Sequence, residues 1–200
     1  MRATNVVFDI GGVLVDWFAH LAWADKLGSP QAAKEFMARV NFKERNARAD
    51  GGVPFAQLAS EVAAPEDAAL VAEYPALFQK TVPSKISGTW DILAQLQARK
   101  IPLHAITNWS AETWPEGLKA HPQLGEVFET LVVSGREGMI KPDRRIFELF
   151  CARAGVAAQA CIFIDDSLPN VTSARGIGMD AVHFTDSAQL ETDLTARGLL

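Results

Sequence analysis

The chain has 200 residues, of which 48% are hydrophobic and 22% charged, and its formal net charge at pH 7 is -5. This composition is typical of an ordinary globular protein, with enough chain for one substantial core or for a core domain that carries a smaller insert. The slightly acidic balance leaves no basic surplus to neutralise a phosphodiester backbone, so we expect no nucleic-acid partner.

The first expected element is a buried strand at residues 6–10, "VVFDI", which carries Asp9 near its end and is followed by two glycines. Residues 16–82 then lack a buried-strand pattern and are typical of a helical unit, with helices expected at 20–28, 31–42, 54–63 and 65–80. Pro83 and Gly88 mark the return of the chain to the core. We therefore predict an α/β core made of residues 1–15 and 83–200, and a small helical cap made of residues 16–82.

From residue 83 onward, short apolar runs alternate with helical patterns. Strands are expected at 103–107, 129–134, 161–165 and 181–184, and helices at 89–100, 142–155 and 186–200. Helix 89–100 places Trp90, Leu93 and Leu96 on one stripe, and Gly155 ends helix 142–155. This alternation predicts a doubly wound parallel sheet of the Rossmann-like type.

Polar side chains stand where the predicted strands end. Asp9 closes the first strand, Thr107 and Asn108 the second, and Asp165 and Asp166 the fourth; Ser134 and Lys141 follow the third. In open α/β sheets, ligands bind beyond the carboxyl ends of the strands, so these side chains are the candidates for a site. Helix capping is an adequate alternative explanation for the hydroxyl groups, taken singly.

Lys141 is harder to explain by capping. It precedes Pro142, a good first helical residue, and a cation at a helix N-terminus opposes the helix dipole. We therefore expect an anionic group beside Lys141.

Three carboxylates at one sheet edge would repel one another unless a cation lies among them. Mg2+ takes oxygen ligands and commonly binds through one or two carboxylates plus substrate phosphate. Asp9 and Asp166, supported by Asp165, match this pattern. Lys141 and the Thr107 hydroxyl could then hold the remaining phosphate oxygens.

Four short motifs in this order resemble the haloacid dehalogenase (HAD) superfamily across about residues 4–184. They are "FDIGGVL" with the nucleophilic aspartate, "AITNWS" with the threonine or serine, "IKPD" with the lysine, and "FIDDSLPN" with the acidic pair. Each motif alone is weak, whereas the ordered set is specific. The helical insert after the first motif resembles the small helical cap of that superfamily.

The resemblance implies a role for each matching residue. Asp9 would attack phosphorus to form an aspartyl-phosphate, Thr107 would bind the phosphoryl group, and Lys141 would offset negative charge. Asp9, Asp165, Asp166 and the backbone carbonyl of Gly11 would hold Mg2+. The expected activity is therefore covalent phosphate-ester hydrolysis with electrostatic stabilisation of the transferred group.

Gly11 departs from the common pattern of the superfamily. Most of its phosphatases carry a second aspartate here, which protonates the leaving group and then activates water. Such a positioned acid and base contributes roughly 100- to 10,000-fold to the rate. A branch of sugar-1-phosphate phosphatases also shows Asp-x-Gly, and this chain is similar to it over its length. An anomeric alcohol leaves readily and needs less acid assistance, which favours a sugar phosphate.

Additional substrate contacts are expected from the insert and from the second motif. The stretch "NFKERNARADGG" is typical of a solvated helix face, but a cap that closes over a phosphate would use its cations. We predict that Arg45 or Arg48 faces the site, and that Asn108 and Trp109 line its entrance. The tryptophans in general are expected to pack in the core or between cap and core.

Cysteine content and hydropathy predict a cytoplasmic protein. Cys151 and Cys161 lack Cys-x-x-Cys spacing, which favours core thiols in a reducing compartment. The N-terminal stretch is too short and acidic for a signal peptide, and no run approaches the roughly 20 apolar residues of a membrane span. We expect a monomer or homodimer without a membrane partner.

The sequence thus predicts a Mg2+-dependent phosphatase acting on a small phosphorylated metabolite. One alternative is a 2-haloacid dehalogenase, in which Asp9 attacks carbon without a metal; "TNWS" favours it slightly, while the doubled Asp165 and Asp166 oppose it. Another alternative is a non-catalytic phosphate-binding module, which the absence of an acid at Gly11 leaves open. A receiver domain carries its acidic pair after the first strand and a single aspartate after the third. Here the single acid, Asp9, comes first and the acidic pair comes late, which opposes a receiver domain.

Overall fold

In the computed structural model, which describes residues 4–200, five parallel strands form one sheet in the order β3-β2-β1-β4-β5. The strands are β1 Asn5–Phe8, β2 Leu103–Thr107, β3 Thr130–Val133, β4 Cys161–Asp165 and β5 Asp180–His183. Each strand overlaps one of the five predicted runs, so the predicted doubly wound parallel sheet is confirmed. The chain moves from β1 outward to β3 and then crosses to β4 on the other side of β1, so the strand order reverses between β1 and β4.

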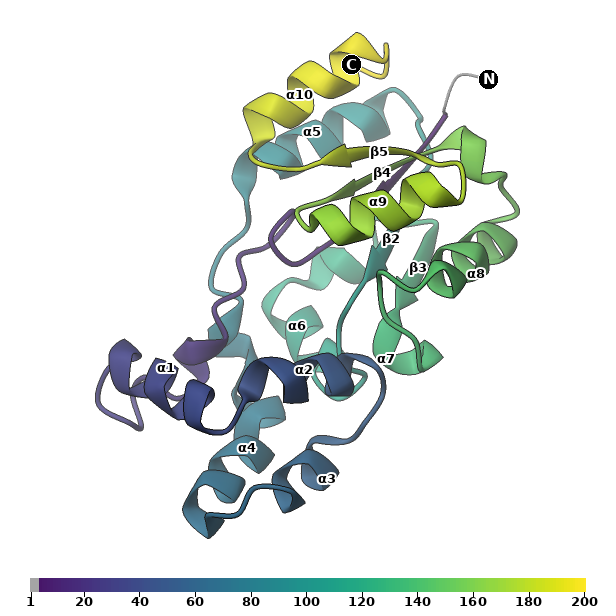
Figure 1. Ribbon diagram of the computed structural model, residues 1–200. Coiled ribbons are helices and arrows are strands. Elements are labelled where there is room, and N and C mark those ends of the chain that lie inside the picture. The colour runs from purple at the N-terminus through teal and green to yellow at the C-terminus, as the bar shows by residue number, and fades with distance from the viewer. Residues whose placement is uncertain (1–3) are drawn as a thin grey trace.

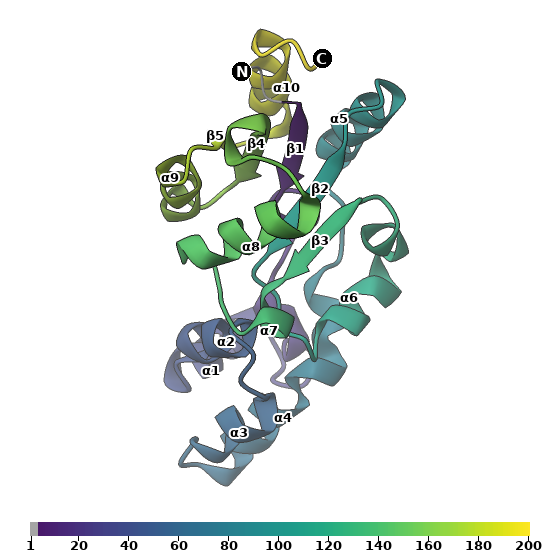
Figure 2. The same ribbon diagram turned by 90° about the vertical axis from the view of Figure 1, so that its right-hand side faces the viewer.

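Helices cover both faces of the sheet (Figures 1 and 2). The helices of the core are α5 Ser87–Ala98, α6 Trp114–Ala120, α7 Ser134–Glu137, α8 Arg144–Ala154, α9 Leu168–Gly176 and α10 Ser187–Ala196. Short 3-10 helices lie at Pro122–Gly125 and Ala158–Ala160. The three predicted core helices correspond to α5, α8 and α10, and Gly155 ends α8 in the left-handed conformation as expected.

The alternation of side chains along each strand produces two separate hydrophobic clusters. Val7, Ile106 and Phe163 point to the face covered by α8 and α9, where they pack with Phe147 and Val171. Their neighbours Val6, Phe8, Ala105, Ile162 and Ile164 belong to the opposite cluster, which includes side chains of α5 and α10. Because both faces of the sheet are buried, the strands are mostly apolar and do not alternate strictly between apolar and polar residues.

The segment between β1 and β2 forms a helical unit beyond the carboxyl ends of the strands (Figure 1). Its helices are α1 Pro30–Arg39, α2 Phe42–Asp50, α3 Phe55–Ser60 and α4 Pro65–Leu77, with 3-10 helices at Ala19–Ala22 and Phe78–Thr81. The helix predicted at 20–28 is wrong beyond its first residues, because turns follow the 3-10 helix at Ala19–Ala22. Residues 42–50 are a complete helix, α2.

An aromatic cluster holds the helical unit together. Trp23 stacks on Tyr74 with ring centroids 5.1 Å apart, and meets Phe36 and Phe42 edge to face at 4.9 and 5.0 Å. The indole Nε1 of Trp23 donates a hydrogen bond to the Leu70 carbonyl at 2.9 Å, so burial of its polar atom is compensated. The unit thus has apolar packing of its own.

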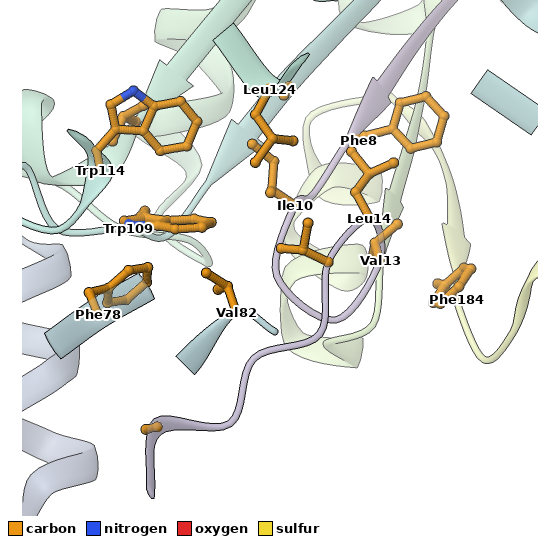
Figure 3. Packing of buried hydrophobic residues seen from close by; sticks show 14 of the residues in the cluster. Phe8, Ile10, Val13, Leu14, Phe78, Val82, Trp109, Trp114, Leu124 and Phe184 are labelled. Carbon is orange, nitrogen blue, oxygen red and sulfur yellow. The ribbon is translucent and has the colours of Figure 1, made fainter. Parts of the chain in front are cut away.

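A second aromatic group joins the helical unit to the core. Trp109 lies between Trp114 of α6 and Phe78, with centroid separations of 5.2 and 5.1 Å (Figure 3). Trp109 and Trp114, like Trp23, are buried, which confirms the predicted packing role of these tryptophans. Trp17 differs, since 43% of its surface is exposed.

The two connections between the helical unit and the core run side by side. Val15 and Lys85 form an antiparallel bridge, the Asp16 amide donates to the Ser84 carbonyl at 3.0 Å, and the Ile86 amide donates to the Leu14 carbonyl at 2.9 Å. The chain therefore leaves and returns through one paired ribbon.

Among residues 4–200, none of the helices combines the length and apolar character required to cross a lipid bilayer.

Candidate active site

Asp9 lies where β1 ends, at the point where the strand order reverses. Its backbone amide still donates to the Ile164 carbonyl of β4 at 2.8 Å, while its Oδ1 accepts from the Ile10 amide at 2.7 Å. The chain then turns through Gly12, whose φ is 77°, and the Gly12 amide donates to the Val15 carbonyl. A left-handed turn directly after the strand fixes the carboxylate at the sheet edge.

Lys141 lies between two carboxylates. Its Nζ is 2.8 Å from Asp9 Oδ1 and 2.7 Å from Asp165 Oδ2, and its residue surface is only 2% exposed. Burial disfavours the charged form, yet the two carboxylates raise the pKa of Lys141 above its ordinary value. The expected anionic partner is therefore present. Helix α8 begins at Arg144 with Asp143 as its N-cap, so Pro142 precedes the helix and does not begin it.

Asn108 fixes the backbone of Lys141. Its Nδ2 donates to the Lys141 carbonyl at 2.9 Å, and its Oδ1 accepts from the Lys141 amide at 2.8 Å. This two-bond contact joins the loop after β2 to the loop before α8. The side chain of Asn108 therefore holds the backbone of Lys141, from which the lysine side chain extends toward Asp9.

The two acidic residues after β4 have different surroundings. Asp165 is fully buried and accepts hydrogen bonds from the Ser167 amide at 2.8 Å and from Asn170 Nδ2 at 3.0 Å. Asp166 is more exposed and lines a cavity together with Asp9. Burial and the charge of Asp165 raise the pKa of Asp166.

These carboxylates form a set that fits a hard cation. Oxygen atoms of Asp9, Asp165 and Asp166 lie within 4.8 Å of one another. Burial raises the pKa of Asp9 to about 8, and the charges of Asp165 and Asp166 add to this, although Lys141 opposes it. One lysine thus does not fully compensate three acids, and a divalent ion with oxygen ligands would stabilise their ionised forms.

Replacement of Gly12 tests the geometry of this acidic set. A Cβ atom at Gly12 would lie 2.6 Å from Asp166 Oδ2, at a backbone φ that L-residues rarely adopt. We expect Gly12→Ala to lower the free energy of unfolding by about 1 to 3 kcal/mol and to weaken Mg2+ binding. Urea unfolding and calorimetric titration with Mg2+ measure the two effects.

Gly28→Ala is the matched control, because Gly28 has a φ of 84° with no atom within 4 Å of the added Cβ. Gly28→Ala should lower the free energy of unfolding by about 1 kcal/mol, because an L-residue is strained at this φ, but its added Cβ does not contact Asp166. Equal unfolding costs and equal Mg2+ affinities in the two variants would contradict the proposed closeness of Gly12 and Asp166.

A cavity of about 230 Å³ opens beside Asp9. One part of its lining is aromatic, from Trp17, Phe78 and Trp109, and another part is polar. The polar and small residues are Asp9, Gly11, Asn46, Asp50, Asn108, Thr113 and Asp166. The cavity therefore lies between the sheet edge and the helical unit.

The structure brings most of the predicted site residues together. Asp9, Gly11, Asn108, Trp109 and Asp166 line the cavity. Lys141 and Asp165 lie directly behind Asp9 in an ion-pair chain, and Thr107 is buried at the end of β2 without lining the cavity.

The two arginines predicted to face the site do not line the cavity. Arg48 forms an ion pair with Glu61 at 2.5 Å, and Arg45 Nη2 lies 3.4 Å from the Glu61 carbonyl. The cavity is lined from the same helix by Asn46 and Asp50 instead. These two are four residues apart and share one face of α2, so the periodicity of the predicted helix face could have grouped them, whereas the prediction followed the positive charges.

An aspartate at the switch point of a parallel sheet, paired with a buried lysine and flanked by further carboxylates, forms a candidate active site of an α/β protein. The model of the haloacid dehalogenase-like hydrolase family matches residues 4–178, and the chain belongs to that family. The predicted family and the prediction of a hydrolase are thus confirmed.

Relatives of known name include phosphatases. The chain is 26% identical over 187 residues to the sesquiterpene phosphatase astK of Aspergillus oryzae, covering 90% of this chain and 89% of that protein. It is 27% identical over 190 residues to a phosphoglycolate phosphatase of Pseudomonas putida, covering 90% and 68%. The magnesium complex of the HAD family enzyme bt-2542 from Bacteroides thetaiotaomicron superposes with a TM-score of 0.71 at 18% identity, covering 98% and 99%, which shows a shared fold.

Proposed function

We propose that this protein is a Mg2+-dependent phosphatase that hydrolyses a small phosphorylated metabolite through an aspartyl-phosphate on Asp9. The observation that carries the proposal is the Asp9–Lys141 ion pair beside the acidic set at the mouth of one cavity. The phosphatases among its relatives support the choice of phosphorus over carbon as the atom attacked.

In this mechanism the chain's own residues bind and orient the phosphate. An oxygen of Asp9 attacks phosphorus, and the buried ammonium of Lys141 offsets the negative charge that gathers near it. Asn108 holds Lys141 in place, and Thr107 is the proposed hydroxyl donor to the phosphoryl group. Mg2+, held by Asp9, Asp166 and the Gly11 carbonyl with Asp165 beside them, would supply further positive charge for the phosphate oxygens.

The helical unit is proposed to act as a cap. In this proposal residues 16–82 cover the site formed by residues 1–15 and 83–200, of which residues 1–3 lie outside the described part. Trp17, Asn46, Asp50 and Phe78 reach the cavity from this unit, and a covered site excludes water that would compete for the transferred group.

The lining of the cavity bears on the substrate. The Asp-x-Gly motif favours a sugar phosphate, whose ring could stack on Trp109 or Trp17. The three aromatic residues equally favour the phosphate ester of an apolar alcohol, and the sesquiterpene phosphatase relative supports this second candidate. Both candidates are phosphate monoesters with the same reacting atoms.

A panel of phosphate esters tests the proposal. It contains sugar phosphates, phosphoglycolate and a prenyl phosphate, each assayed for phosphate release with Mg2+ and with a chelator. We expect release from at least one ester, and a fall of about 100-fold or more on chelation, because a large part of the charge stabilisation is removed.

Chloroacetate in the same assay examines the dehalogenase alternative. Chloride release that persists with the chelator, together with no phosphate release from any ester, would overturn the proposed function. Tight binding of Mg2+ and phosphate without turnover of any ester would favour the non-catalytic module.

A further inference from the structure

The position where a second acid is expected holds open space. A Cβ atom built on Gly11 would meet no atom within 4 Å, and Gly11 itself lines the cavity. No neighbouring side chain of the described residues therefore fills the place next to this glycine. Hydrolysis of an ester with a poor leaving group still requires a proton donor for the departing oxygen and a proton acceptor for the attacking water.

The titratable residues that line the cavity, within the described part of the chain, are Asp9, Asp50 and Asp166. Asp9 is committed to the ion pair with Lys141 and to attack on phosphorus, and Asp166 belongs to the acidic set. Asp50 has neither role. It is the last residue of α2 and approaches the cavity from the helical unit.

Two hydrogen bonds hold Asp50 in place. Its Oδ2 accepts a hydrogen bond from Asn46 Nδ2 at 2.9 Å, one turn earlier on α2. Its backbone carbonyl accepts from Ser134 Oγ at 2.6 Å. Asn46 therefore orients the carboxylate from within the helical unit, and Ser134, the first residue of α7, ties the backbone of Asp50 to the core.

We propose that Asp50 is the general acid and base of the reaction, since it lines the same cavity as Gly11, the position without an acidic side chain. This inference rests on the proposed phosphatase function. In the first step Asp9 Oδ bonds to phosphorus, the ester P–O bond breaks, and the proton of the Asp50 carboxyl group passes to the departing oxygen. In the second step the Asp50 carboxylate takes a proton from water, whose oxygen bonds to phosphorus as the P–O bond to Asp9 breaks and phosphate leaves.

The surroundings of Asp50 suit both steps. Burial raises its pKa to about 7, while the Ser110 amide and the charge of Lys141 act in the opposite direction. Asp9 and Asp166 share the cavity with Asp50. Burial and, to a lesser extent, the charge of Asp50 raise the pKa of Tyr74 of α4. Near neutral pH, Asp50 therefore has access to both its protonated and its ionised form.

The test compares wild type with Asp50→Asn on two Mg2+-supported substrates, p-nitrophenyl phosphate and an alkyl phosphate whose alcohol leaves poorly. We expect the variant to lose about 100-fold or more of its rate on the alkyl ester. With p-nitrophenyl phosphate we expect a burst of one nitrophenolate per enzyme followed by slow turnover, because water is no longer activated. Acid quenching should then trap phosphate covalently on the variant.

Controls separate a chemical role from a structural one. Asp50→Glu should restore part of the rate, and Glu73→Gln, an exposed acid of α4 paired with Lys26, should behave as wild type. Equal losses on both esters without a burst, or no loss at all, would overturn the role of Asp50 and leave the phosphatase proposal standing. No turnover of either ester, or of the wider ester panel, by the wild type would overturn the proposed function and with it this inference.

Discussion

Asp9→Asn is expected to lower phosphate release by at least about 10,000-fold, because removal of a catalytic nucleophile costs this much or more in enzymes with covalent intermediates. The amide of asparagine is nearly the same size as the carboxylate and still reaches Lys141, but it cannot bond to phosphorus and release it again. Steady-state phosphate release with Mg2+ measures the loss.

Asp16→Asn serves as the matched control for the nucleophile. Asp16 lies seven residues later on the ribbon, where its Oδ2 accepts a hydrogen bond from Ser84 Oγ at 2.6 Å. It does not line the cavity, so we expect an unchanged rate. Retention of a tenth or more of the activity by Asp9→Asn, with wild-type thermal stability, would remove the nucleophile assignment.

Lys141→Met is expected to lower the free energy of unfolding by about 3 to 5 kcal/mol and to abolish activity. The variant leaves Asp9 and Asp165 buried without their shared cation, and removing one partner of a buried ion pair has costs of this size. Because folding raises the pKa of Lys141, its contribution is fully present below the unfolded-state pKa and is lost as pH rises through the folded-state value. Urea unfolding at pH 7 therefore measures the whole effect.

Lys119→Met provides the comparison for a lysine in a solvent-exposed pair. Lys119 contacts Glu116 at 2.6 Å on α6, and its side chain is 62% exposed. Exposed ion pairs contribute about 0 to 1 kcal/mol to the free energy of unfolding, so this variant should be nearly as stable as the wild type. Similar unfolding free energies for the two variants would show that the buried ion-pair chain does not form.

The sheet and the strand-end residues were predictable because both depend on short-range patterns. An apolar run of four or five residues followed by a turn is sufficient to predict β1 or β4, and parallel strands bring their carboxyl ends to one edge. The convergence of Asp9, Lys141 and Asp165 follows from that topology. The sequence could not, however, show that Lys141 lies between the two carboxylates, because this depends on the side-chain packing of three separate loops.

The part of the site contributed by the helical unit was not predictable in the same way. Helix α2 buries only Phe42 and Ala49, so it lacks the apolar stripe that would show which side of the helix faces the rest of the protein. The stretch was predicted as a solvated helix face, but its pattern did not show which side of the helix meets the cavity, so Arg45 and Arg48 appeared as suitable as Asn46 and Asp50. Electrostatic preference for a phosphate pointed to the cations, whereas Glu61, an acid of the same unit, pairs with Arg48.

The paired ribbon that joins the helical unit to the core has a mechanical consequence. Two unpaired linkers would allow the unit to shift in several directions, whereas the hydrogen bonds around Val15 and Lys85 hold the two connections together. A tilt of the helical unit away from the core would break the bond between Ser134 Oγ and the Asp50 carbonyl and draw Asp50 away, while Asp9 and Lys141 stay in place. Substrate admission and assembly of the complete reacting set would then be one and the same movement.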